Sequence, residues 1–132
     1  MLRPDIAIIT DSDESHAEIF TGMKPGGIVI IDRDIEQFDL LKSLADKRSL
    51  SIISFGDNSI ADSFIVECLE AANGTKTKAS ILGEIVDFFL PLPGRDFVQH
   101  ALAVLTAVKI LGGDLERSIL ALSNQELSLI HI

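Results

Sequence analysis

Hydrophobic residues in the first half of the chain form short continuous runs separated by polar turns. Three runs rich in β-branched residues predict buried strands over Ile6–Thr10, Gly27–Asp32 and Ser49–Phe55. Apolar residues at helical spacing between them predict one helix that ends at Gly22 and another over Ile35–Lys47. Strands that alternate with helices through short loops are typical of crossover units, so we expect a parallel sheet covered on both faces.

The pattern changes after residue 58 to shorter segments separated by turn residues. Ile60–Leu69, Lys76–Leu82 and Glu84–Leu90 are predicted strands. The turn at Ala72–Thr75 contains an Asn-Gly pair, which is a strong hairpin signal, and Gly83 marks the next turn. An antiparallel three-stranded meander should therefore follow the parallel strands.

The segment from Pro91 to Gly113 is the most informative part of the sequence. Pro91–Gly94 form a stiff turn, and nothing after Arg95 breaks a helix until Gly112–Gly113. The residues expected on its apolar face are Phe97, Ala101, Val104, Leu105, Val108 and Leu111. Asp114 then starts a last helix through Leu122. The predicted fold class is α/β: three parallel strands with crossover helices, an antiparallel three-stranded meander, then two helices.

Composition narrows the function classes. The chain has 132 residues, 47% of them apolar, with a mean hydropathy of +0.36, which predicts one globular core. A net charge of −9 argues against a nucleic-acid partner. A single cysteine, Cys68, fits a reducing compartment, and no apolar run approaches the roughly 20 residues of a membrane span. We expect a cytoplasmic protein with no nucleic-acid or membrane partner.

Candidate chemistry is sparse. The sequence contains no GxxxxGK[ST], GxGxxG, HExxH, CxxC or GxSxG motif. The acidic run Asp11–Glu14 could hold Mg²⁺, but a solvated loop is the favoured interpretation, and Lys24–Gly27 is better explained as a turn than as an anion cradle. His16 is either a metal ligand or an ordinary half-exposed histidine. Asp96 and His100 share one helix face, where they either pair with each other or meet a ligand.

The order of these segments resembles a known family. DIAIIT, AEIFTGMKPGGIVIIDRDIEQFDLL, a strand ending in SFG, a meander and PLPGRDFVQHALAVLTAVKILGGDLE together resemble the second half of the central domain of the Mur ligases. Within that family the pattern is most similar to ligases that add D-alanyl-D-alanine to UDP-N-acetylmuramoyl-tripeptide. The resemblance covers about residues 5–122. Short segments such as KPGG and LPGR are specific together and weak singly.

The resemblance implies an ATP-dependent amide ligase of peptidoglycan synthesis, in which an acyl phosphate on the UDP-linked peptide is attacked by the amine of D-alanyl-D-alanine. It implies ATP and Mg²⁺ as cofactors, and UDP-muramoyl-peptide and D-alanyl-D-alanine as substrates of the full-length parent. Residues 1–126 would be part of the central ATP-binding domain, without its P-loop half. We therefore expect a fragment that is inactive alone, with self-association through an exposed sheet edge.

Two other functions stay open. One is another ligase of the same superfamily, such as a folylpolyglutamate synthase, and the other is a non-catalytic α/β binding module.

The last six residues, LSLIHI at 127–132, match the translation of a sequencing adapter and are predicted to be a non-native tail, with a natural edge strand as the alternative.

The resemblance also assigns site residues. It makes Asp96 and His100 the nucleotide-binding positions, because the helix after LPGR reaches the adenine in this family, and it makes His16 the metal ligand. It assigns no catalytic residue. The family usually has His and Asn at the first two positions and Asn in place of Asp32, and the lysine that helps to hold Mg²⁺ is missing beside His16. These departures predict weakened adenine binding.

Overall fold

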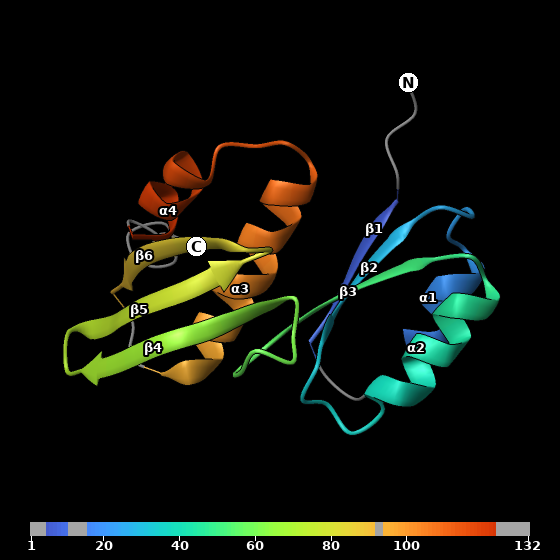
Figure 1. Cartoon of the computed structure of the whole chain (residues 1–132), viewed down its shortest axis with the longest axis horizontal. Helices are drawn as coiled ribbons and strands as arrows, with labels where there is room; N and C mark the ends of the chain where they lie inside the picture. The colour runs from blue at the N-terminus through green and yellow to red at the C-terminus, as the bar shows by residue number, and fades with distance from the viewer. Residues whose placement is uncertain (1–4, 11–15, 92–93, 124–132) are drawn as a thin grey trace.

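Six strands form a single mixed sheet in sequence order, from β1 at one edge to β6 at the other (Figure 1). The computed structural model describes residues 5–10, 16–91 and 94–123. The strands are β1 (Ile6–Ile9), β2 (Ile28–Asp32), β3 (Ser51–Gly56), β4 (Ser63–Ala71), β5 (Gly74–Ile81) and β6 (Glu84–Leu90). The helices are α1 (His16–Thr21), α2 (Phe38–Lys47), α3 (Arg95–Ile110) and α4 (Leu115–Ser123). The acidic run at 11–14 and the tail at 127–132 lie outside the described residues.

The first three strands are parallel, as predicted. Ile6 aligns with Ile28, and Ile28 aligns with Ser51, so the strands advance together through the sheet. Because each strand pairs with the next one in sequence, right-handed crossovers place α1 and α2 on the same face. The buried residues of that face form one cluster: Ile9, Phe20, Val29, Ile31, Phe38, Leu41, Ala45 and Leu50.

The meander continues the parallel sheet without a break. β4 is parallel to β3 over two residue pairs and then antiparallel to β5, which is antiparallel to β6. β4 begins at Ser63, not at Ile60 as predicted, because Ser54 and Asp62 hold the preceding loop. The Ser54 N–H donates to Asp62 Oδ2 at 2.8 Å, and the Asp62 N–H donates to Ser54 Oγ at 3.1 Å.

The first hairpin turn is tighter than predicted. Ala71 pairs directly with Gly74, so the turn consists of two residues and β5 begins at Gly74 instead of Lys76. Gly74 has φ 149°, and a Cβ there would lie 2.3 Å from the Leu90 carbonyl oxygen. Only glycine fits where β5 passes this close to the end of β6. The second turn is Leu82–Gly83, one residue longer than predicted because β5 ends at Ile81 and not at Leu82, and β6 has the predicted bounds.

The buried face of α3 differs from the predicted one. Three of the residues expected to be buried are exposed: Phe97 at 46%, Val104 at 42% and Leu111 at 55%. Ala101 and Leu105 are buried as predicted, and the other buried residues of the helix are Val98, Leu102, Ala103 and Thr106. Apolar residues surround most of this helix, so spacing alone selects two possible faces, and contact with β2–β5 selects one of them.

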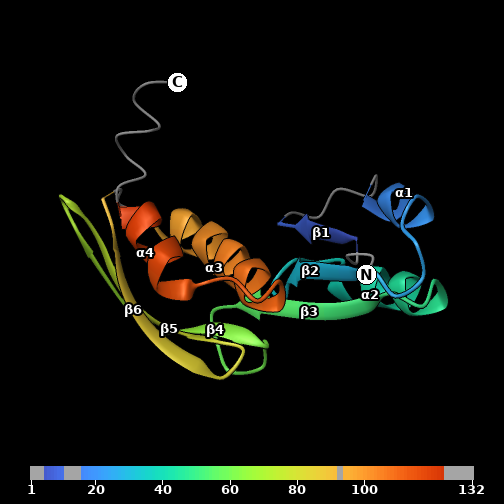
Figure 2. The same ribbon diagram turned by 90° about the horizontal axis from the view of Figure 1, so that it is seen from above.

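The helices α3 and α4 lie together against the concave side of the curved meander (Figure 2). Leu115 of α4 is buried in the same cluster as Leu102 and Leu105 of α3. Gly112, with φ 77°, ends α3 in the left-handed conformation, as the sequence predicts. No helix in the described ranges is long and apolar enough to cross a membrane.

Candidate functional site

A cleft of about 420 Å³ opens where β1 and β2 end. Thr10 follows β1, Asp32 is the last residue of β2, and the first turns of α3 supply the remaining lining residues, Asp96, Gln99 and His100. Open α/β sheets bind ligands at the carboxyl ends of their strands, because loops and helix starts gather there. The cleft therefore has the position expected of a ligand site.

The start of α3 is held in place by its own backbone and core contacts. Gly94 precedes the helix with φ 121°, a conformation that an L-residue adopts only with strain. Val98 and Ala101 are buried and anchor the first two turns on the sheet. Asp96 and His100 consequently project from a rigid helix, which suits them to hold a ligand in one orientation.

The cleft carries several carboxylates. Partial burial raises the pKa of the Asp32 carboxyl above its ordinary value, and the charges of Asp34 and Asp57 raise this pKa further. The Asp34 N–H, which donates to Asp32 Oδ1 at 2.9 Å, and the charge of His100 act in the opposite direction. A negative field at this end of the sheet favours ligand groups that donate hydrogen bonds and disfavours free phosphate.

A polar clamp joins α3 to the loop after β3. Arg95 Nη2 lies 3.4 Å from Asp57 Oδ1, and Gln99 Nε2 donates to the same carboxylate oxygen. The other amide atom, Gln99 Oε1, is buried without a hydrogen-bond partner. A buried acceptor without a donor costs free energy, and it belongs to Gln99, one of the residues that line the cleft.

Comparison with known proteins identifies the family. A sequence profile of the Mur ligase middle domain matches residues 13–108, which is most of the chain. The chain belongs to the Mur ligase middle domain family. It is 27% identical over 134 residues to UDP-N-acetylmuramate–L-alanine ligase from Bradyrhizobium diazoefficiens, covering 84% of this chain and 28% of that protein. It is 26% identical over 133 residues to UDP-N-acetylmuramoyl-tripeptide–D-alanyl-D-alanine ligase from Rickettsia prowazekii, covering 89% and 30%.

Solved structures share the fold of this Mur ligase middle domain. MurF from Acinetobacter baumannii matches with a TM-score of 0.71 at 24% identity, over 81% of this chain and 23% of that one. A folylpolyglutamate synthase from Mycobacterium tuberculosis, solved with ADP, matches with a TM-score of 0.68 at 18% identity, over 90% and 30%. At these identities the likeness shows the fold alone. The chain spans less than a third of the curated relatives that it matches.

The structure brings together two of the three predicted site residues of this Mur ligase middle domain. Asp96 and His100 line the same cleft. His16 is the first residue of α1, and its side chain lies outside the described part of the structure. Sequence reasoning missed Thr10 and Gln99 as lining residues. Thr10 could have been predicted as a lining residue because it directly follows a parallel strand. The place of Gln99 in the lining could not, because it depends on how α3 packs near the end of that strand.

Within the described ranges, no group of three or more His, Cys, Asp or Glu side chains could hold a metal ion. Asp32 and Asp34 are tied to backbone N–H groups instead, since Asp34 Oδ2 accepts from the Asp57 N–H at 3.2 Å. The described part of the cleft is therefore suited to hydrogen-bond donors.

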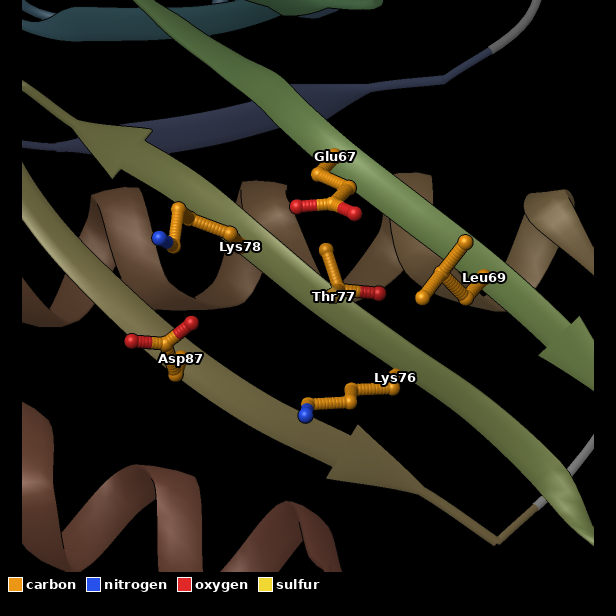
Figure 3. Close-up of a pocket in the computed structure, with 6 residues that line it drawn as sticks. All are labelled: Glu67, Leu69, Lys76, Thr77, Lys78 and Asp87. Atoms are coloured by element: carbon orange, nitrogen blue, oxygen red, sulfur yellow. The ribbon is translucent and has the colours of Figure 1, made fainter.

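A second hollow, of about 130 Å³, lies on the outer face of the meander (Figure 3). Its six lining residues come from β4, β5 and β6, and α3 passes behind the sheet. Lys78 sits between Glu67 on one neighbouring strand and Asp87 on the other. Opposite charges that face each other across strands stabilise a solvated sheet surface, so this hollow has a structural explanation without a ligand.

Proposed function

We propose that this chain is part of an ATP-dependent amide ligase that joins D-alanyl-D-alanine to UDP-N-acetylmuramoyl-tripeptide, and that the cleft at the ends of β1 and β2 takes the adenosine part of ATP. The observation that carries the proposal is the cleft itself, at the carboxyl ends of parallel strands in a member of the Mur ligase middle domain family. The resemblance of segments such as KPGG and LPGR supports the choice of substrate.

The lining of the cleft fits a nucleoside better than a phosphate chain. The carboxylates of Asp32 and Asp96 are hydrogen-bond acceptors, which suit ribose hydroxyls and an exocyclic amino group. The cleft volume is in the range of small-molecule sites. The phosphates would have to point away from the carboxylates of Asp32 and Asp57, toward groups that the described residues do not supply.

A second candidate function is the addition of L-alanine to UDP-N-acetylmuramate. It is favoured by the relative from Bradyrhizobium diazoefficiens, which matches at 27% identity, about the same as the D-alanyl-D-alanine ligase from Rickettsia prowazekii. The sequence on either side of this segment in its gene separates the two candidates. A flanking region similar to the L-alanine ligases would replace the first proposal by the second.

The adenosine proposal is tested by titrating the chain with ADP in a calorimeter and by nuclear magnetic resonance. We expect weak binding that shifts the backbone signals of Asp32 and Gln99, and tighter binding by the double variant Asp96→His/His100→Asn, which introduces the residues usual in the family. The matched control is Asp46→Asn on α2, which removes an exposed carboxylate outside the cleft. Unchanged signals at the cleft in all variants would contradict the assignment.

We also propose that the chain does not turn over ATP by itself, because the sequence of the chain has no GxxxxGK[ST] motif to bind the phosphates. The assay is phosphate release from ATP in the presence of Mg²⁺, UDP-N-acetylmuramoyl-tripeptide and D-alanyl-D-alanine. We expect none above the rate without protein. Substrate-dependent turnover by the purified 132-residue chain would refute this part of the proposal.

A further inference from the structure

A groove of about 520 Å³ is lined by β6 and α4, near the C-terminal end of α3, where Lys109 contacts Glu84. The strand β6 and the helix α4 lie side by side in Figure 2. The walls of the groove come from one strand and one helix. The lining residues are Glu84, Ile85, Val86 and Asp87 of β6, and Leu115, Glu116, Ile119 and Leu120 of α4. None of these residues lines the cleft, so the groove is a separate surface.

One wall of the groove is an open strand edge. β6 is the last strand of the sheet and, in the described part of the chain, pairs with β5 alone. The two-residue turn before β6 makes Ile81 and Glu84 a hydrogen-bonded pair. Hydrogen bonding to the partner strand alternates along an antiparallel strand, so Ile85, Asp87 and Phe89 direct their N–H and C=O groups away from β5. These groups form a template for one more strand.

The side chains around this edge define the ligand that would fit. Ile85 on β6 is 57% exposed and Leu120 on α4 is 64% exposed, which leaves apolar surface on both walls. The lining includes three carboxylates and no basic residue. Lys109 Nζ lies 3.3 Å from Glu84 Oε1 and compensates that charge, and Lys78 faces Asp87 across the strands, so Glu116 is the carboxylate available to a ligand.

Two basic residues lie near these carboxylates. Lys78 lies opposite Asp87 on β5, and Arg117 follows Glu116 on α4. Neither lines the groove. A second copy of this chain is a poor occupant of this groove, because the groove lining is acidic and a chain with 20 acidic and 11 basic residues offers it few compensating charges.

We propose that this groove binds an extended segment of another polypeptide, in which basic and apolar side chains alternate. The segment adds to β6 as a seventh strand and bonds to the outward main-chain groups of Ile85, Asp87 and Phe89. Side chains alternate between the two faces of a strand, so its apolar side chains pack against Ile85 on the outer face and its basic side chains face Glu116 of α4 on the opposite face. Strand addition beside a helix supplies affinity through main-chain hydrogen bonds and specificity through alternate side chains.

The test uses the whole chain and a synthetic peptide of about eight residues that alternates lysine and valine. Binding is measured by fluorescence anisotropy, and hydrogen exchange is followed at each backbone amide. We expect slower exchange at Ile85, Asp87 and Phe89 and unchanged exchange at Val86 and Phe88, whose amides already face β5. A peptide methylated on alternate backbone nitrogens keeps its side chains but cannot form the ladder, so it should not bind.

Two chain variants test the charge requirement. Glu116→Gln should weaken binding of the lysine peptide by up to about fivefold, as expected for one exposed ion pair. The control, Glu70→Gln, removes an exposed carboxylate of β4 outside the groove and should leave the affinity unchanged.

Three results with peptide would overturn the proposal, and so would one result without it. They are equal binding of the methylated peptide, equal binding of a glutamate–valine peptide, and uniform exchange along β6 when the peptide is present. Concentration-dependent protection of the same amides without peptide would assign the edge to a second copy of the chain and would also overturn it.

Discussion

Replacing Thr106 by valine removes a hydroxyl from the middle of a buried hydrogen-bond chain that joins α3 to the sheet. Thr106 and Ser63 are fully buried, and their hydroxyl oxygens lie 2.8 Å apart. Thr106 Oγ1 also donates to the Leu102 carbonyl oxygen at 2.6 Å, and Ser63 Oγ accepts from the Leu82 N–H at 3.2 Å. Each hydroxyl has one proton, so with Thr106 donating to Leu102, Ser63 donates to Thr106.

The size of the effect follows from which atoms lose partners. Valine has nearly the shape of threonine, so Thr106→Val leaves the Ser63 proton without an acceptor and costs about 2 kcal/mol of unfolding free energy. Ser63→Ala leaves the part-buried Leu82 N–H without its Ser63 acceptor and should cost about 2 kcal/mol as well. The double variant lacks both hydroxyls and leaves only the Leu82 N–H unsatisfied. Its cost should be about 1–2 kcal/mol below the sum of the single costs.

Urea unfolding measures these differences. With a slope of about 2 kcal/mol per molar urea, each single variant should lower the midpoint by about 1 M. The control is Ser118→Ala on α4, because Ser118 Oγ donates to the Asp114 carbonyl oxygen at 3.1 Å in a solvent-accessible position. Its cost should stay below about 0.5 kcal/mol. Additive costs of the two buried substitutions, or a Thr106→Val midpoint equal to that of the parent, would refute the hydrogen-bond chain.

Three further predictions concern single positions. The pKa of the Asp32 carboxyl is raised in the folded chain, so the folded chain binds the carboxyl proton more tightly than the unfolded chain does. The stability that Asp32 contributes is therefore present below its ordinary pKa of 3.8 and is lost as the pH rises through the raised pKa. Asp32→Asn should remove that loss, measured as a smaller decrease in unfolding free energy between about pH 3 and about pH 7. Gly74→Ala places a Cβ 2.3 Å from a carbonyl oxygen and should lower the free energy of unfolding in urea by more than about 3 kcal/mol. Gly83→Ala has open space around the new Cβ and should lower it by about 1 kcal/mol. Ile8→Lys, on the open edge strand β1, should reduce concentration-dependent self-association in analytical ultracentrifugation, and a parent chain that stays monomeric at all concentrations would contradict it.

The strands were predictable where local signals agree. β6 has its predicted bounds because alternating apolar residues follow the turn at Gly83 and stop at Pro91. α3 begins and ends as predicted because Gly94 and Gly112 both adopt positive φ. Signals of this kind depend on a few neighbouring residues, so they survive in any tertiary context.

Long-range contacts decided the rest. The buried face of α3 could not be predicted, because Val98 and Leu102 compete with Phe97 and Val104 at equivalent helical spacing. β4 starts late because a side chain of β3, Ser54, holds the loop before it. In the cleft, spacing brought Asp96 and His100 together, but the role of Gln99 depends on its contact with Asp57, which is 42 residues away in sequence.

The helix α3 connects the cleft and the groove, and its geometry determines how far the two surfaces influence each other. Its 16 residues span about 24 Å, which exceeds the Debye length of about 8 Å at physiological salt. At the far end, Lys109 Nζ donates to the Ile81 carbonyl oxygen at 3.0 Å and lies close to Glu84, so the helix is fastened to the turn before β6. A charge change at Glu116 therefore reaches His100 only through movement of the whole helix, which its buried contacts with the sheet oppose. Substitutions at the two surfaces should consequently have additive effects on the binding free energies of the peptide and of ADP. A coupling free energy above about 0.5 kcal/mol between the two substitutions would show that α3 moves and transmits a change from one surface to the other.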